Sequence, residues 1–443
     1  MAPDGHSPVT GRAGAHGWRV TDEAVHKSVY CDPEVFAAER ERVFRKSWLF
    51  ACHESQLPEA GSYLGLELAG YPIVLVRGRD DVVRCLFNRC PHKGARLVEN
   101  GPGQVRMFRC LYHAWTFGLD GARHTIPLKD GYDETGLDGC AWTQRMAEAG
   151  RVEGYRGFLF VTFNREAPGL EAHLGPVRHV FDDIVDRSPE NRVTAGRRPY
   201  RMRIRANWKL YIENLQDTVH PHAAHQSSFD AADDIAESYF PGGGVPFRVE
   251  LLRNNGAAFP FFEQLEQIAF PGGHTTMGGI VSSGSADPMA RMMREALAAA
   301  KGAEEAERIM SVSRHNTIVY PNLSVQSTFG QLRVIQPVSV DETVVEVHHL
   351  RFEGLPDEYY RARSLAFTNT VNAPSTMISA DDIETFQRVQ GGIRAAEPEW
   401  LSLHRDAGRD ARFDDRRTAI GTSELPQRAQ LQRWRALMEA GDA

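Results

Sequence analysis

The sequence has few cysteines and no long apolar run. Its 443 residues include six cysteines, scattered from Cys31 to Cys140, too sparse for a disulfide framework. No stretch is apolar over the length needed to span a bilayer, and the N-terminal MAPDGHSPVTGRAGAHG lacks the charged-then-apolar pattern of a secretory signal. We therefore expect a cytoplasmic protein whose cysteines are free for other chemistry.

A strong excess of one charge is also absent. The 51 basic and 58 acidic residues give a net charge of −7, which argues against nucleic acid or an anionic membrane as the main partner. The length allows two or three domains and a large buried core. We find no internal repeat and no low-complexity segment.

Two loops that each hold one cysteine and one histidine are the most specific feature. Short β-rich runs at 71–77, 82–88 and 105–108, separated by turn residues, predict a small all-β unit. Within it stand Cys90-Pro91-His92 and Cys110-Leu111-Tyr112-His113, with seventeen residues between the two pairs. Four unrelated residues would rarely show this pattern, so we interpret it as a metal site.

Two metal centres fit this donor set. Two Cys and two His could bind zinc in a tetrahedral site. They could also hold a Rieske [2Fe–2S] cluster, with Cys90 and Cys110 on one iron and His92 and His113 on the other. Zinc sites usually group Cys with Cys and His with His, whereas each loop here carries one of each, and this favours the Rieske cluster.

A second metal pattern lies in the segment 207–225, which reads NWKLYIENLQDTVHPHAAH. Its first half has helical apolar spacing, and Asp217 is three residues before His220, on the same helix face. Pro221 disturbs the helix and lets His225 reach the same point. With a carboxylate from elsewhere, the two histidines would form the triad that holds non-haem Fe(II). Alone, a His-rich helix end is more often a surface or core feature.

The missing carboxylate is expected on a late helix. The run 379–386 offers Asp381, Asp382 and Glu384. Ser379 resembles an N-cap, which would place the two aspartates in the first turn, where acids also simply complement the helix dipole. The residues alone do not choose among the three.

Together these motifs resemble the catalytic large (α) subunit of Rieske non-haem iron aromatic ring-hydroxylating oxygenases. The resemblance covers most of the chain and also includes Asn207-Trp208-Lys209 and Glu213-Asn214. Small departures occur at Lys93, where the family often has Arg, at Ala114, where Gly is common, and at Val219, where Tyr often precedes the first iron-binding His. None of them removes a predicted ligand.

The resemblance implies an α+β fold. An all-β Rieske domain would span residues 46–165 and a catalytic domain with an antiparallel sheet wrapped around helices (helix-grip, START-like) residues 166–443. Residues 1–45 would form a tail and a helix packed on the catalytic domain. The run 425–438, rich in Arg and Gln, predicts a surface helix.

The resemblance also assigns roles to single residues. Asp382 would complete the iron site, with Asp381 as the reserve and Glu384 third. Asp217 would hold His220 by its second N–H, and would receive electrons from His113 of a neighbouring subunit. Asn214 would lie near the open iron position.

The implied function is a terminal oxygenase component that uses O₂. Electrons would come from NAD(P)H through a reductase or ferredoxin, and the product would be a cis-dihydrodiol or a hydroxylated ring. The residue pattern at 207–217 is similar to that of the family branch that acts on aromatic carboxylic acids. An arginine such as Arg314 or Arg333 would then pair with the substrate carboxylate. The electron route implies three α subunits, with or without three small β subunits.

Three other functions need to be weighed. A Rieske monooxygenase acting as an O- or N-demethylase would share every motif. An electron-transfer Rieske protein could end near Phe163, so the long remainder argues against it. A ligand-binding module without iron would have lost His220, His225 or the late acid, and all are present.

Overall fold

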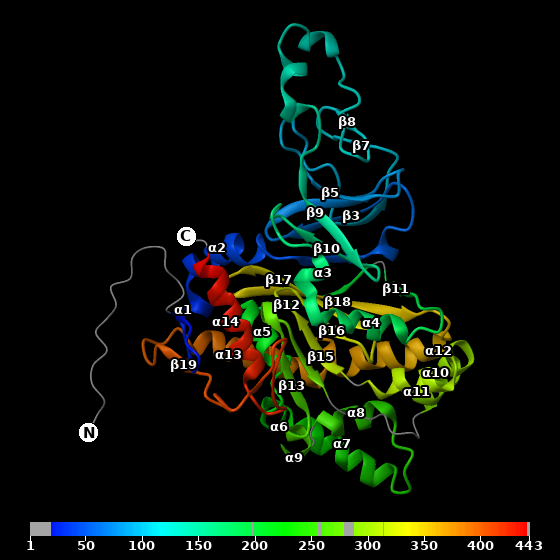
Figure 1. Ribbon diagram of the computed structural model, residues 1–443, viewed down its shortest axis with the longest axis vertical. Helices are drawn as coiled ribbons and strands as arrows, with labels where there is room; N and C mark the ends of the chain where they lie inside the picture. The colour runs from blue at the N-terminus through cyan, green and yellow to red at the C-terminus, as the bar shows by residue number, and fades with distance from the viewer. Residues whose placement is uncertain (1–18, 197, 256–258, 279–287, 313, 441–443) are drawn as a thin grey trace.

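Two antiparallel sheets organise the molecule. The computed structural model describes residues 19–196, 198–255, 259–278, 288–312 and 314–440. A seven-stranded sheet lies in the part that projects from a larger body built on a ten-stranded sheet (Figure 1). In the described part of the chain, no helix combines the length and apolar character needed to cross a membrane.

The smaller sheet carries the cysteine–histidine loops. Its strands run in the order β2 (Leu49–His53), β10 (Phe158–Thr162), β9 (Glu148–Tyr155), β5 (Val83–Phe87), β4 (Tyr71–Arg77), β3 (Ser62–Leu68) and β6 (Gly101–Gln104). The separate pair β7 (Phe108–Arg109) and β8 (Thr116–Phe117) brackets the second loop. Along β4, Val74 and Val76 face one core and Ile73 and Leu75 face another, as the period of two in a strand requires. The loops therefore stand on a rigid base.

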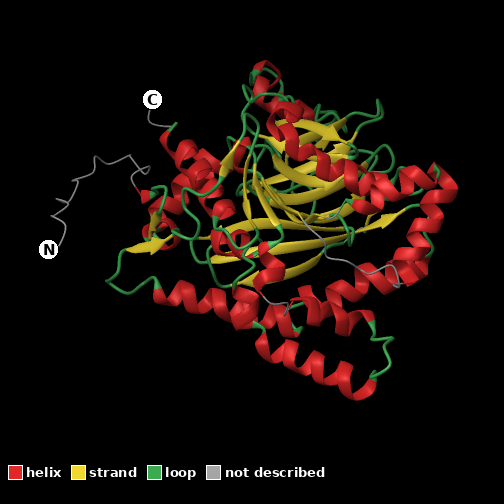
Figure 2. Ribbon diagram, turned by 60° about the horizontal axis from the view of Figure 1, so that its bottom comes forward, coloured by secondary structure: helices red, strands yellow, loops and turns green. Residues whose placement is uncertain are grey.

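The larger sheet is a meander of antiparallel strands. Its order is β11 (Val193–Ala195), β18 (Glu342–Phe352), β17 (Gln331–Ser339), β16 (Leu323–Gln326), β15 (Arg314–Val319), β14 (Thr275–Gly278), β13 (Glu266–Ala269), β21 (Arg417–Ile420) and β20 (Ala411–Arg412), and β12 (Tyr200–Ile204) also pairs with β18. Helices pack around this curved sheet (Figure 2). The predicted α+β class with an antiparallel catalytic sheet is confirmed.

The helices that matter for the site come from distant parts of the chain. They are α5 (Trp208–Asn214), α6 (His220–Ala224), α7 (Gln226–Tyr239), α13 (Met377–Gly392) and α14 (Leu425–Glu439). The others are α1 (Ser28–Cys31), α2 (Pro33–Glu39), α3 (Leu170–Leu174), α4 (His179–Asp186), α8 (Phe247–Asn255), α9 (Phe259–Glu263), α10 (Pro288–Lys301), α11 (Ala303–Ser311) and α12 (Asp357–Tyr360), with π-helices that include η10 (Thr368–Asn372). The short pair β1 (Ala24–His26) and β19 (Trp400–Ser402) joins an early segment of the chain to the segment that follows α13.

The first half of helix α14 is buried and only its last turns reach the surface, so the prediction of a surface helix is wrong for most of its length. Its polar side chains find partners inside the protein. Gln430 Nε2 donates to Thr275 Oγ1 at 3.0 Å, and Gln427 Nε2 donates to the Glu213 carbonyl oxygen at 3.1 Å. Buried polar groups persist when they are hydrogen-bonded, which a count of Arg and Gln cannot reveal.

A buried carboxylate connects three of these helices. Glu39 of α2 is completely buried and accepts hydrogen bonds from Lys209 Nζ at 2.5 Å, Trp208 Nε1 at 2.9 Å and Trp434 Nε1 at 2.7 Å. Lys209 is itself only 2% exposed. Each donor offsets part of the desolvation cost of the carboxylate, so the buried charge of Glu39 is stable only when all three donors are present.

Removing one charge of this pair should be far worse than removing both. We expect Lys209→Met to lower the free energy of unfolding by roughly 3–5 kcal/mol, because Glu39 then remains as an uncompensated buried charge. Urea unfolding monitored by circular dichroism measures this. The double variant Lys209→Met/Glu39→Gln should recover most of the loss, and a double variant as unstable as the sum of the singles would contradict the coupling.

Candidate active site

The two cysteine–histidine loops share one backbone conformation. In each, the cysteine N–H donates to the carbonyl oxygen five residues later, from Cys90 to Ala95 and from Cys110 to Trp115, at 2.8 Å in both. A second bond closes each loop from the residue four positions later back to the cysteine carbonyl. The repeated geometry places the two thiols at equivalent points, whereas the imidazole follows its cysteine by two residues in one loop (His92) and by three in the other (His113).

The donor atoms of these loops fit a Rieske cluster. Cys90 and Cys110 are 1% and 3% exposed. Burial raises the pKa of the Cys90 thiol, and the backbone N–H of His92, which donates to its sulfur, lowers that pKa in part. The rings of His92 and His113 are 4.6 Å apart. Nδ1 of His92 is buried and has no hydrogen-bond partner among the described residues. Buried thiols with imidazoles nearer the surface match the two ends of such a cluster.

The segment that carries the second histidine pair is broken into two helices. Helix α5 ends at Asn214, and α6 begins at His220. Between them, Asp217 Oδ1 accepts the backbone N–H groups of Val219 at 2.7 Å and His220 at 3.2 Å. The prediction that Asp217 and His220 share one continuous helix is therefore wrong. The turn held by the Asp217 side chain brings them together instead.

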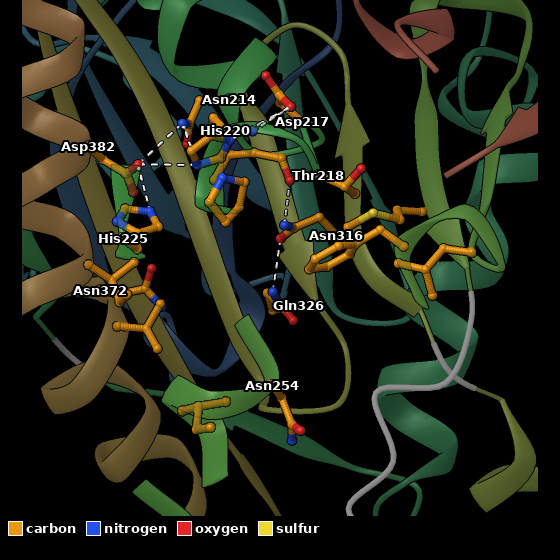
Figure 3. Close-up of a pocket in the computed structure, with 18 of the residues that line it drawn as sticks. Asn214, Asp217, Thr218, His220, His225, Asn254, Asn316, Gln326, Asn372 and Asp382 are labelled. Atoms are coloured by element: carbon orange, nitrogen blue, oxygen red, sulfur yellow. Dashed lines mark hydrogen bonds and ion pairs between the residues drawn. The ribbon is translucent and has the colours of Figure 1, made fainter. Parts of the chain in front are cut away.

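Three predicted ligands meet at one point. One atom each from His220, His225 and Asp382 lies within 4.8 Å of the others (Figure 3). Asp382 Oδ1 is 3.4 Å from His220 Nε2 and 3.3 Å from His225 Nε2. Two imidazoles and one carboxylate on one side of a cavity are the donor set of a non-haem Fe(II) site with open positions.

A further carboxylate faces the far side of each imidazole. Asp217 Oδ1 lies 3.9 Å from His220 Nδ1, and Asp381 Oδ2 lies 3.2 Å from His225 Nδ1. Each ring thus turns Nε2 to the common point and Nδ1 towards an acid. The contact between Asp381 and His225 has hydrogen-bond length and orients that ring. The distance of 3.9 Å between Asp217 and His220 is too long for the predicted hydrogen bond. Although burial lowers the pKa of His220, Asp217 and Asp382 outweigh it and raise that pKa to about 9.

The structure separates the three acids that the sequence left open. Asp382 faces the two histidines, Asp381 contacts the back of His225, and Glu384 pairs with Arg388 at 2.8 Å. The predicted N-cap Ser379 is wrong. Thr376 caps α13 and accepts the Ser379 N–H at 3.3 Å. The aspartates therefore lie beyond the first turn, and at that distance the helix dipole stabilises their charges little.

Asn214 lies against the same three side chains. Its Nδ2 is 3.0 Å from His220 Nε2 and 3.3 Å from Asp382 Oδ1. It thus lies beside the point that the three side chains share.

A cavity of about 150 Å³ opens beside these ligands. Its apolar lining comes from Leu251, Phe261, Phe262, Leu265, Met277, Phe367, Val371 and Ile378, and its polar wall includes Asn316, Gln326, Arg333 and Asn372. Of this wall, sequence reasoning found only Arg333. The three carboxamides lie on strand faces or in a π-helix and follow no motif.

Arg333 is a buried cation in that wall. It is 3% exposed, and Nε donates to Gln331 Oε1 at 3.0 Å. Burial lowers its pKa, while Tyr211 and Asp382 oppose this effect. No carboxylate forms an ion pair with it within the described ranges. The alternative, Arg314, begins β15, but its side chain lies outside the described part.

The sequence matches two families of known proteins. Residues 47–136 match the "Rieske [2Fe-2S] domain" and residues 192–440, more than half of the chain, match the "Ring hydroxylating alpha subunit (catalytic domain)". The chain is 30% identical to the toluate 1,2-dioxygenase α subunit of Pseudomonas putida, over 83% of this chain and 78% of that protein. It is 29% identical to the 2-halobenzoate 1,2-dioxygenase large subunit of Burkholderia cepacia, over 86% and 79%.

The fold agrees with a solved structure. Naphthalene 1,2-dioxygenase with indole bound in the active site superposes with a TM-score of 0.79, at 23% identity, over 94% of this chain and 92% of that chain. Fold and sites define an oxygenase with a Rieske cluster and a mononuclear iron. The chain belongs to the family of ring-hydroxylating dioxygenase α subunits. Members are oxygenase components that work with a reductase or ferredoxin and form multimers.

Four residues after its cysteine, each loop has a residue in the left-handed backbone region, and this shared feature can be tested. Gly94 and Ala114 are the equivalent residues, with φ of +80° and +55°. Alanine in this left-handed region costs about 1 kcal/mol, so Ala114→Gly should raise the midpoint of thermal bleaching of the cluster absorbance. Gly94→Ala should lower it by backbone strain alone, because an added Cβ would meet only Arg89 atoms, at 3.5 Å or more. Equal midpoints in all three proteins would contradict the equivalence.

Proposed function

We propose that this chain is the terminal oxygenase that dihydroxylates a single-ring aromatic carboxylic acid. The observation that carries the proposal is a buried cation, Arg333, in the wall of a cavity that opens on His220, His225 and Asp382. A volume of about 150 Å³ accommodates one benzene ring. A substrate carboxylate would supply the counter-charge that Arg333 lacks among the described residues.

Each part of the site contributes to this reaction. When bound, the cluster supplies single electrons and the mononuclear iron activates O₂. His220, His225 and Asp382 would hold the iron on one side and leave the cavity side open. Asp381 orients the imidazole of His225 by a hydrogen bond, Asp217 lies behind that of His220, and the apolar wall excludes water from the ring. The protein's contribution is geometry and a dry cavity.

We further propose that electrons arrive from the cluster of a neighbouring subunit. The β7–β8 pair that bears His113 and the helix α6 lie in different halves of the chain (Figure 1). His113 is exposed, and the Asp217 side chain is 39% exposed. Both ends of a bridge from the partner subunit's His113 to Asp217 are thus open to contact. This supports three α subunits, alone or with three β subunits, in the cytoplasm where NAD(P)H is available.

Metal content tests the two sites together. We expect aerobically purified protein to contain about three irons per chain and, after dithionite reduction, to give a Rieske-type EPR signal. His225→Ala should lose the mononuclear iron, leave about two irons and retain the signal. A colourless protein with stoichiometric zinc would overturn the oxygenase assignment. With a reductase and methoxybenzoates, release of formaldehyde rather than formation of a cis-dihydrodiol would favour a demethylase.

The role of Arg333 is tested with a charged and a neutral substrate. Arg333→Gln should weaken benzoate binding about 100-fold, since a buried charge-assisted bond is worth 2–5 kcal/mol, while binding of toluene changes far less. Anaerobic titration of the iron-loaded enzyme measures both affinities, and iron content shows whether the site remains intact. Equal losses for benzoate and toluene would argue against carboxylate recognition by this residue.

A further inference from the structure

The polar wall of the cavity has hydrogen-bond directions that the chain itself fixes. A guanidinium group only donates, so the partner of Arg333 Nε must be an oxygen. That partner is Gln331 Oε1 at 3.0 Å. The amide nitrogen of Gln331 consequently faces the other way and donates to Thr368 Oγ1 at 3.1 Å. Arg333 thereby sets the orientation of a completely buried carboxamide.

The orientation of the Gln331 carboxamide in turn fixes that of Asn372. Gln331 Oε1 also accepts a bond at 3.0 Å from Asn372, and only the amide nitrogen of Asn372 can donate it. Asn372 Oδ1 must therefore point away from Gln331. Asn372 is 6% exposed and lines the cavity below His225 (Figure 3). Among the described residues, no donor reaches this oxygen.

Two further carboxamides of the wall, Asn316 and Gln326, offer no such acceptor. Asn316 Nδ2 donates to the Leu215 carbonyl oxygen at 2.5 Å, and its Oδ1 accepts from Gln326 Nε2 at 2.9 Å, so both ends are used. Gln326 Oε1 has no partner, but protein atoms cover it, and a ligand cannot reach it. Of these three buried carboxamides, Asn372 is therefore the one whose oxygen is left to accept a bond from a bound molecule.

We propose that Asn372 selects aromatic acids that carry a hydrogen-bond donor, a hydroxyl or amino group, on the ring. The inference rests on the proposed function, in which Arg333 binds the carboxylate. A ring without a donor leaves the oxygen of Asn372 desolvated and unpaired, and a site built around such a polar group discriminates against that ligand. The substrate class is thus hydroxy- or amino-substituted benzoate.

The test compares ligands that differ only in the donor. We would titrate the anaerobic, iron-loaded enzyme with benzoate, with the positional isomers of hydroxy- and aminobenzoate, and with the matching methoxybenzoates, which are similar in position but lack the donor. At least one hydroxybenzoate or aminobenzoate should bind about 10-fold more tightly than benzoate. It should exceed the methoxybenzoate of the same substitution pattern by a similar factor, which is within the range for one buried hydrogen bond.

A pair of variants assigns the preference to one side chain. Asn372→Leu should bring the ratio of affinities close to one, whereas Asn254→Leu, at an exposed carboxamide of the cavity rim, should keep the wild-type ratio. Iron content and the EPR signal show that each variant retains its metal centres. If Asn372→Leu does not fold, the wild-type ligand series still decides.

The outcomes separate the two proposals. Donor-bearing acids that bind no better than benzoate, or a preference that survives Asn372→Leu, would overturn the role of Asn372 and leave the aromatic-acid function standing. Failure of every benzoate to bind, with toluene bound, would overturn the proposed acid substrate and the inference with it.

Discussion

The carboxylate of Glu39 is the constraint on which the rest of the catalytic part depends. It is completely buried and accepts from Lys209, Trp208 and Trp434, which come from α5 and α14. An isolated charge could not remain in such a place, so the three segments must come together for any of them to be stable. The start of α5 is fixed as a result, and with it the position of Asn214 at the other end of that helix.

Further hydrogen bonds extend this frame to the third ligand. Gln390 of α13 accepts the Asn207 N–H at 2.8 Å and donates to the Tyr30 carbonyl oxygen at 3.1 Å. It therefore connects the helix that bears Asp382 to the N-cap of α5. The histidines and the aspartate are more than 150 positions apart in sequence, yet one set of buried bonds sets their relative positions. The relative positions of the predicted ligands therefore follow from protein packing.

The sequence predicted the features that are local. The cysteine–histidine loops and the His220–His225 spacing lie within short segments, so the chemistry could be inferred from residue types and intervals. The choice between Asp381 and Asp382 could not, because it depends on which face of α13 turns to the histidines. Burial of α14 was missed because Gln430 and Gln427 find partners on segments remote in sequence. The ligand roles themselves stay predictions until metal content is measured.

The cavity wall and the metal site take most of their residues from different elements, although η10 is hydrogen-bonded to the first turn of α13. The predicted ligands belong to α6, its junction with α7, and α13, whereas Arg333 and Gln331 lie on β17 and Asn372 ends η10. A substitution in the wall can alter which ring substituent is accepted without displacing a ligand. Such a division favours the evolution of new specificities. A few substitutions on a sheet face can change which aromatic substrate is accepted, while the residues of the metal site stay the same.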